Sequence, residues 1–299
     1  MTQLTLPPMP IIVGSPRSGT TLLRMMLDAH SAIAIPPETG FLLVGRDWTA
    51  SGDELRELFV RAVTSYPPDA PAWNDFHLSA DEFRSRLLDI KPFNLAGGFR
   101  LFYQLYAERF HKPRWGDKTP IYCRHIEYLD GLLPEARFIH LVRDGRDVTV
   151  SLRRQWFSPG HDIEAHAQYW RENVTDARAQ GRRCRHYLEV RYESLIQEPE
   201  RELRAICAFV EVDFESAMLR YFERAASRLD EHLERRRADG SLLVTRERRI
   251  EQQIATTQPP DLARVGAWKA ALTAEESRAF EAVAGDVLRE FGYPVEDGG

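Results

Sequence analysis

The fold of this chain is decided by the stretch "IIVGSPRSGTTLLRMML", residues 11–27. Its first part belongs to a compact apolar run closed by glycine, which predicts a short buried strand over residues 9–14. Its second part places leucines and methionines at helical spacing and predicts a helix over residues 20–30. A strand, a glycine-containing turn and a helix in this order are typical of an α/β fold.

The turn nearly matches the phosphate-binding pattern G-x-x-x-x-G-K-[ST]. Gly14 and Gly19 keep the spacing and Thr21 stands at the Ser/Thr position, but Thr20 replaces the lysine. Backbone N–H groups at the start of a helix still favour an anion. A nucleoside triphosphate also needs the lysine on its phosphates, and the nearest replacement is Arg17, whose planar guanidinium suits phosphate or sulfate oxygens. We therefore expect a phosphoryl-like ligand without a triphosphate.

Strands alternate with helices along the rest of the chain, which predicts an α/β fold with a P-loop-type, mostly parallel sheet flanked by helices. Ligands of such folds bind at the carboxyl ends of the strands. The predicted strands cover residues 32–38, 136–143 and the start of 186–195, and the predicted helices cover 53–63, 79–90, 97–110, 121–134, 147–156, the end of 186–195, and 272–292. Asp53 and Ser79 are the expected caps of the first two helices.

No repeat or linker divides the sequence, so we expect a single domain over residues 1–299. Residues 46–112 form a mostly helical insertion, which we expect to shape the pocket for a second substrate. Residues 225–262 are arginine-rich and interrupted by "ADG". This segment fits either a solvated pair of helices or a mobile flap over the site.

Composition narrows the class of protein. Apolar residues make up 43% and charged residues 28% of the chain, as in ordinary globular proteins, and the net charge of −5 argues against a nucleic-acid partner. Cys123, Cys184 and Cys207 have neither disulfide-like nor metal-like spacing, so no metal is expected. The sequence has no signal-type N-terminus and no apolar run of the ~20 residues that a membrane span needs, which predicts a cytoplasmic protein. Arginine far outnumbers lysine, as in GC-rich bacterial genomes.

A second anion site is predicted after the strand over residues 136–143. Arg143 ends this strand, and Ser151 follows about two helical turns later. An arginine at a strand end and a hydroxyl on the following helix suit a phosphate group. Together with the glycine-containing turn, they indicate a ligand with two separated phosphates.

Several motifs together resemble the sulfotransferase family. They are, in chain order, "PRSGTTLLRMMLDAH", "PPET", "GDKTP", "LVRDGRD", "SLRR" and "VRYESL". They run from about residue 10 to 210, and the resemblance returns at "RVGAWK", residues 264–269. The chain is most similar to the branch that contains the tyrosylprotein sulfotransferases and related bacterial enzymes.

The resemblance implies the donor 3′-phosphoadenosine 5′-phosphosulfate, which has no γ-phosphate and needs neither the missing lysine nor a metal. Its 5′-phosphosulfate would be held by Arg17, Ser18, Gly19, Thr20, Thr21 and Leu22, with Arg17 also acting in catalysis. Its 3′-phosphate would be held by Arg143 and Ser151, and Tyr192 would lie beside the nucleotide. Arg264 is similar to a late donor-binding arginine of the family, whereas Trp268 fits a purely anchoring role as well.

The resemblance also implies the catalytic pair. Glu38 in "IPPET" matches the general base of the tyrosylprotein branch, and Lys118 in "WGDKTP" matches the lysine that stabilises the leaving phosphate. Cytosolic relatives use a histidine as base, but His111 and His125 lack the surrounding motif. Each residue has an alternative interpretation. Glu38 could be a carboxylate that stabilises a helix N-terminus, and Lys118 could form a surface ion pair with Asp117.

The implied function is transfer of a sulfuryl group to an acceptor hydroxyl on a small metabolite, phenol, glycan or peptide tyrosine. Two alternatives stay open: a P-loop kinase of nucleotides or small molecules, and a noncatalytic regulator that binds 3′-phosphoadenosine 5′-phosphate. Some members of the family are dimers, so a homodimer is a further possibility.

Overall fold

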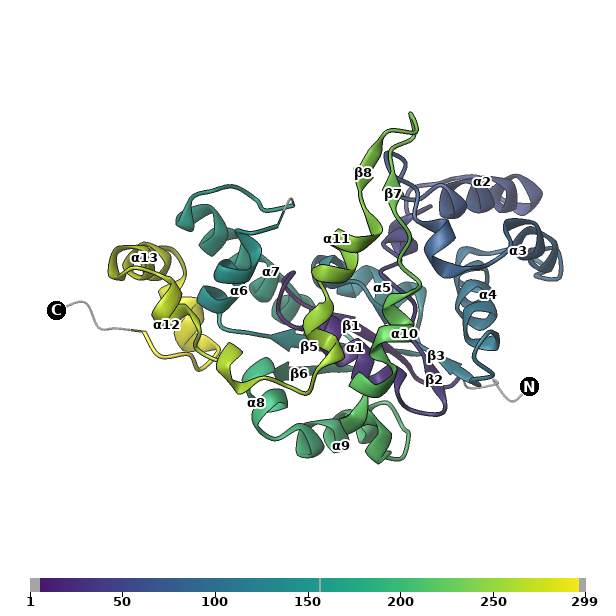
Figure 1. Cartoon of the computed structure of the whole chain (residues 1–299). Helices are drawn as coiled ribbons and strands as arrows, with labels where there is room; N and C mark the ends of the chain where they lie inside the picture. Colours follow the sequence, from purple (N-terminus) through teal and green to yellow (C-terminus); the bar gives the residue numbers. More distant parts are fainter. Residues whose placement is uncertain (1–5, 156, 296–299) are drawn as a thin grey trace.

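A computed structural model describes residues 6–155 and 157–295, and its centre is a sheet of four parallel strands (Figure 1). The strand order is β4 (Asp117–Lys118), β1 (Met9–Val13), β5 (Ala136–Val142) and β6 (Tyr187–Arg191). The predicted α/β class with a mostly parallel sheet is therefore confirmed. Three predicted strands, over 9–14, 136–143 and the start of 186–195, are present in this sheet.

β1 lies in the interior of the sheet and is buried on both faces, which explains its unbroken apolar sequence. Side chains alternate between the two faces of a strand. Ile12 accordingly joins a core cluster with the helix that follows β1, whereas Ile11 and Val13 join a second cluster on the opposite face. The sheet is thus sandwiched between two apolar layers.

Helices cover both faces of the sheet (Figure 1). One face packs against α1 (Thr20–Asp28), α8 (Tyr192–Gln197) and α9 (Pro199–Phe209). The other face packs against elements that include α4 (Leu95–Glu108), α5 (Ile126–Leu132) and α7 (Ile163–Gly181). α6 (Gly145–Leu152) and α13 (Ala274–Glu290) pack on α7. α13 starts with a capping box at Thr273, which confirms the predicted start of the C-terminal helix.

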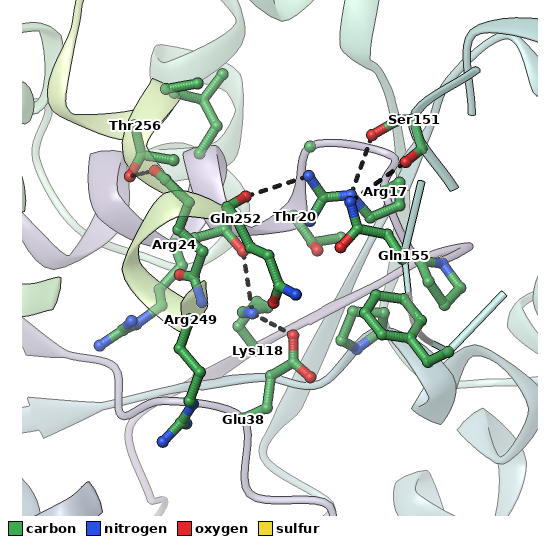
Figure 2. Close-up of a pocket in the computed structure, with 18 of the residues that line it drawn as sticks. Arg17, Thr20, Arg24, Glu38, Lys118, Ser151, Gln155, Arg249, Gln252 and Thr256 are labelled. Atoms are coloured by element: carbon green, nitrogen blue, oxygen red, sulfur yellow. Dashed lines mark hydrogen bonds and ion pairs between the residues drawn. The ribbon is translucent and has the colours of Figure 1, made fainter. Parts of the chain in front are cut away.

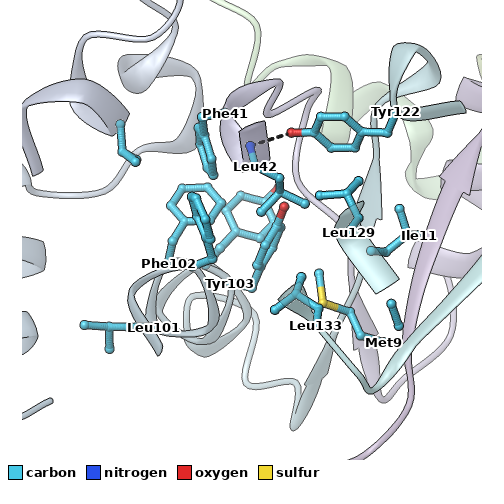
Figure 3. Close-up of a cluster of buried hydrophobic side chains, with 14 of the residues drawn as sticks. Met9, Ile11, Phe41, Leu42, Leu101, Phe102, Tyr103, Tyr122, Leu129 and Leu133 are labelled. Atoms are coloured by element: carbon cyan, nitrogen blue, oxygen red, sulfur yellow. Dashed lines mark hydrogen bonds between the residues drawn. The ribbon is translucent and has the colours of Figure 1, made fainter. Parts of the chain in front are cut away.

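The predicted helical insertion contains α2 (Gly52–Thr64), α3 (Ala80–Leu87) and α4. An aromatic core joins these helices to the sheet: the rings of Phe41 and Phe102 meet edge to face with centroids 4.8 Å apart (Figure 3). Ser79 caps α3 as predicted. The N-cap of α2 is Ser51 rather than Asp53, because Asp53 already lies in the first helical turn.

Three predicted elements differ from the structure. Only Ile33–Ala34 of the strand over 32–38 is extended, as β2, and it pairs with β3 (Arg114–Trp115) outside the central sheet. The helix over 121–134 is divided at His125, whose backbone leaves helical angles, into the 3-10 turn η3 (Pro120–Arg124) and α5. The helix over 147–156 begins earlier and ends at Leu152; the Trp156 end of that prediction lies outside the described residues.

The segment 225–262 is not a pair of helices. It runs from the end of α10 (Phe222–Leu229) through an antiparallel hairpin of β7 (Arg235–Arg236) and β8 (Leu242–Val244) to α11 (Arg246–Glu251). In Figure 1 the hairpin rises beside α2. The remaining short elements are η1 (Phe41–Leu43), η2 (Trp73–Phe76), η4 (Ser216–Arg220), η5 (Ile254–Thr257), η6 (Leu262–Arg264) and α12 (Trp268–Ala271). Of the helices described, none has the length and apolar character needed to cross a bilayer.

Candidate active site

A cleft of about 970 Å³ opens at the carboxyl ends of the parallel strands. This is the edge at which α/β folds bind their ligands. The walls come from segments within residues 16–24, 37–40, 66–75, 118–121, 143–155 and 232–267. The cleft therefore joins the turn after β1, the end of β4, the helix after β5 and the hairpin segment.

The turn after β1 ends in a helix start that no side chain caps. Gly19 is the N-cap of α1, and no side chain caps the first turn, where Thr20, Thr21 and Leu22 line the cleft. Gly19 has φ 95°, and a Cβ atom there would lie 2.5 Å from the ring of Tyr192. Glycine is thus required both for the backbone angle and for the close approach of Tyr192.

Arg17 reaches across the cleft from the same turn (Figure 2). Its Nε donates to Ser151 Oγ at 3.1 Å and its Nη2 donates to the Gln252 carbonyl at 3.2 Å. Burial lowers the pKa of Arg17, and the negative charge of Glu38 acts against this shift. Of the predicted loop residues, Ser18 differs: its side chain is fully buried and does not line the cleft, so only its backbone is available to support the turn.

Arg143 lies at the end of β5, beside the turn. Its Nη1 donates to the Arg17 carbonyl at 3.4 Å and its Nη2 to the Arg264 carbonyl at 2.7 Å. The guanidinium stacks 4.4 Å from the centre of the Tyr192 ring. Arg143, Ser151 and Tyr192 thus lie together beside the turn that carries Arg17 and Gly19.

The "RVGAWK" segment is held by Asp147. Its carboxylate accepts from the N–H groups of Gly266 at 2.9 Å and Trp268 at 2.8 Å. Trp268 is buried under Arg146, whose guanidinium lies 3.7 Å from the ring centre, and it does not line the cleft. Trp268 is therefore an anchor, whereas the half-exposed Arg264 lines the cleft. Asp147 could have been suspected from the "LVRDGRD" motif.

Glu38 and Lys118 meet inside the cleft (Figure 2). Lys118 Nζ lies 2.6 Å from Glu38 Oε1 and 3.2 Å from Thr21 Oγ1. The lysine side chain is 2% exposed, whereas that of the glutamate is 55% exposed. Burial lowers the pKa of Lys118, and the neighbouring Glu38 opposes this shift. Lys118 is therefore a buried cleft residue whose partner is Glu38, not a surface residue paired with Asp117.

The two histidines considered from the sequence, His111 and His125, do not line the cleft. His232, which sequence reasoning missed, does. Burial and then the nearby Arg249 lower the pKa of His232 to about 3, which makes it a weak base. Among the cleft histidines and carboxylates, Glu38 is the group that contacts Lys118.

Another part of the cleft wall is formed by residues 66–75 and the hairpin. Asp75 joins them: its carboxylate accepts from Arg235 at 2.9 Å and from Arg249 at 2.7 Å. The carbonyl of Asp69 also accepts from the N–H of Ala238 at 2.9 Å. No local motif marks these contacts in the sequence. Across the described ranges, no group of three or more His, Cys, Asp or Glu side chains is arranged as metal ligands.

Known proteins resemble this chain in sequence and in fold. The family model described as "Sulfotransferase family" matches residues 8–216. Nodulation protein NoeE of Sinorhizobium fredii is 27% identical, over 96% of this chain and 67% of that protein. Protein-tyrosine sulfotransferase 1 of Danio rerio is 26% identical, over 96% of this chain and 72% of that protein. Protein-tyrosine sulfotransferase 2 of Gallus gallus is 29% identical, over 72% of this chain and 54% of that protein.

Among solved structures, the sulfotransferase domain of the Synechococcus PCC 7002 olefin synthase has a TM-score of 0.61 and 24% identity, with 98% of both chains covered. The sulfotransferase domain from the curacin biosynthetic pathway has a TM-score of 0.61 and 18% identity, with 97% and 99% covered. These likenesses establish the fold. Because the family model matches more than half of its residues, the chain belongs to the sulfotransferase family.

Proposed function

We propose that this protein transfers a sulfuryl group from 3′-phosphoadenosine 5′-phosphosulfate to the hydroxyl of an acceptor. The observation that carries the proposal is the contact between Lys118 and Glu38 at 2.6 Å, directly beside the helix start at Thr21. A carboxylate and an ammonium group thus stand next to the uncapped start of a helix. This is the arrangement that in-line transfer of a charged group to a hydroxyl requires.

The donor would occupy the side of the cleft that carries unpaired helix N–H groups. The turn and Arg17 would hold the phosphosulfate, and Arg143 with Ser151 would hold the 3′-phosphate. The ring of Tyr192 would lie beside the nucleotide. The fit is supported by the uncapped start of α1 and by guanidinium groups of Arg17 and Arg143 that contact uncharged oxygen atoms.

In the reaction, Glu38 would accept the proton of the acceptor hydroxyl while the acceptor oxygen bonds to sulfur. The bond between sulfur and the bridging oxygen of the donor breaks, and Lys118 would stabilise the negative charge that develops on that oxygen. General-base catalysis typically contributes ~10²–10⁴-fold, and a point charge at a leaving oxygen a comparable amount. Relatives carry the name protein-tyrosine sulfotransferase, but the acceptor class proposed here is only a hydroxyl compound.

A kinase is the main rival, and it is disfavoured by Thr20 at the position of the phosphate-binding lysine. A noncatalytic regulator is disfavoured because Glu38 and Lys118 are held together in the cleft. Calorimetric titration distinguishes all three. The protein is titrated with 3′-phosphoadenosine 5′-phosphate in EDTA and, separately, with ATP and Mg²⁺.

We expect metal-free binding of the bisphosphate and weak binding of ATP, followed by transfer to at least one compound of a hydroxyl acceptor library. A clear ATP signal with no bisphosphate signal would establish the kinase instead. Bisphosphate binding without transfer to any phenol, alcohol, sugar or tyrosine peptide would favour the regulator.

A further inference from the structure

Each proposed catalytic residue has a sequence neighbour that links the same two backbone segments on the core side of the cleft. Glu38 is followed by Thr39, and Lys118 is preceded by Asp117. On the cleft side, Lys118 Nζ contacts Glu38 Oε1 at 2.6 Å. On the core side, Thr39 Oγ1 donates to Asp117 Oδ2 at 2.7 Å.

The alternation of side chains along a strand explains this arrangement. Asp117 and Lys118 form β4, and neighbouring strand residues point to opposite faces. Lys118 therefore faces the cleft while Asp117 faces the core beside the aromatic layer. The two bonds connect the same pair of backbone segments, one on each side.

Further hydrogen bonds complete the link. Tyr103 of α4 donates its hydroxyl to Asp117 Oδ2 at 2.8 Å, and the N–H of Thr39 donates to Thr119 Oγ1 at 3.2 Å. The hydroxyl of Tyr122 accepts from the N–H of Leu42 at 2.8 Å (Figure 3). These groups come from three separate parts of the chain and are all buried.

Burial of a charged carboxylate at position 117 costs free energy of folding. Asp117 is fully buried, and burial raises its pKa to about 6, although hydrogen bonds from Thr39 and Tyr103 oppose the shift. Apolar side chains of similar size often stabilise a buried position better than a charged group does. A directional acceptor for two hydroxyl groups, by contrast, fixes where the segment after Glu38 can lie.

We propose that Thr39 and Asp117 are positioning residues, which hold the Glu38 carboxylate against the Lys118 ammonium group through the hydrogen bond on the core side of β4. This inference rests on the proposed sulfuryl transfer. A base displaced by about 1 Å from its working position can lower a rate ~10²-fold. Loss of the bond should therefore slow turnover without affecting the donor site, which is built from other residues.

The test compares Thr39→Val, which removes the hydroxyl at nearly constant volume, with Thr39→Ser, which keeps it. Thr149→Val is the matched control: Thr149 is fully buried in α6, and its hydroxyl has no hydrogen-bond partner within the described part of the chain. Each variant is measured for kcat and for the Kd of 3′-phosphoadenosine 5′-phosphate. The preserved Kd reports that the variant is folded.

We expect Thr39→Val to lose about 10- to 100-fold in kcat with the Kd within about twofold of the unmodified protein, and Thr39→Ser and Thr149→Val to keep kcat. Equal kcat values for Thr39→Val and the unmodified protein would overturn the inference. Crystals of Thr39→Val give a readout that is independent of activity. A Glu38 carboxylate displaced from Lys118 supports the inference, and an unchanged contact overturns it, even if the unmodified protein transfers no sulfuryl group.

Discussion

The two sides of the cleft are built in different ways. The proposed donor side consists of the turn after β1, the start of α1 and the end of β5, so its backbone N–H groups lie within a few consecutive residues, and the side chains of Arg17, Arg143 and Ser151 complete it. The proposed acceptor side combines Glu38, residues 66–75 and the hairpin that follows α10. It depends on side chains brought together from distant parts of the chain.

The charges on the two sides differ as well. On the donor side, Arg17 and Arg143 hydrogen-bond to uncharged oxygen atoms, and the nearest carboxylate to Arg143, that of Asp147, is 3.8 Å away. On the acceptor side, each cation pairs closely with a carboxylate: Lys118 with Glu38 at 2.6 Å, and both Arg235 and Arg249 with Asp75. The proposed donor side therefore keeps positive charge, whereas Lys118, Arg235 and Arg249 on the proposed acceptor side are paired with carboxylates.

Substitution of the proposed catalytic pair, Glu38 and Lys118, should separate the two sides of the cleft most strongly. Glu38→Ala and Lys118→Ala are expected to lower kcat by about 10²-fold or more, at least ~2.7 kcal/mol, because base and charge stabilisation are lost. Binding of 3′-phosphoadenosine 5′-phosphate should persist, since the turn is unaffected. Steady-state kinetics and calorimetry check both, with the exposed Glu57→Ala as control. Full turnover of Glu38→Ala would exclude this residue as the base.

The buried carboxyl behind the acceptor side should make stability depend on pH. In the folded protein the pKa of Asp117 is about 6, above its usual 3.8. A raised carboxyl pKa means that the folded state binds the proton more tightly, so this stabilisation is present at low pH and is lost as the pH rises through about 6. Relative to Asp117→Asn, the unfolding free energy of the unmodified protein should fall by on the order of 2–3 kcal/mol between pH 4 and 7.

Urea unfolding of both proteins at several pH values measures this difference. The comparison with Asp117→Asn removes the contributions of all other titrating groups, which are shared. A difference that does not change between pH 4 and 7 would show that Asp117 titrates like an exposed carboxyl.

On the donor side, Arg143→Ala should weaken binding itself. A charge-assisted hydrogen bond contributes ~1.5–3 kcal/mol, so the Kd for 3′-phosphoadenosine 5′-phosphate is expected to rise about 10- to 100-fold. Arg137→Ala is the control, because Arg137 lies on the same strand but pairs with Glu211 outside the cleft. An unchanged Kd for Arg143→Ala would show that Arg143 does not bind the proposed second phosphate.

The difference between the two sides of the cleft also explains which features the sequence could predict and which it could not. The strand, turn and helix around Gly19 follow from local periodicity and backbone requirements, so their prediction is confirmed by the structure. Glu38 and Lys118 were predicted from the family motifs, and the structure places them in contact. Their catalytic roles stay predictions.

Long-range side-chain contacts carry no such local signal. Thr39 and Asp117 are 78 residues apart, and Asp75 and Arg249 are 174 residues apart. Periodicity describes which face of an element is apolar, but not which polar side chains meet when elements pack. For the same reason, the hairpin within residues 225–262 was not predicted, and His232 was missed.

The smallest expected effect concerns the link between the hairpin and residues 66–75. Asp75→Asn keeps the size of the side chain but removes the charge that holds Arg235 and Arg249. The Asp75 carboxylate is buried, but the amide oxygen of Asn can still accept from both arginines, so the loss is the charge-assisted part of the hydrogen bonds, on the order of 1 kcal/mol. We therefore expect the KM of the acceptor to rise about 3- to 10-fold. The control is Asp239→Asn at the exposed hairpin tip.

The Kd of 3′-phosphoadenosine 5′-phosphate decides which side of the cleft the hairpin serves. Gln252, at the end of α11, accepts a hydrogen bond from Arg17 through its carbonyl, so a loosened hairpin segment could also reach the donor side. A Kd that stays constant while the acceptor KM rises places the hairpin on the acceptor side alone. A Kd that changes more than the KM would mean that α11 is part of the donor site, and that the two sides are joined through the contact between Arg17 and Gln252.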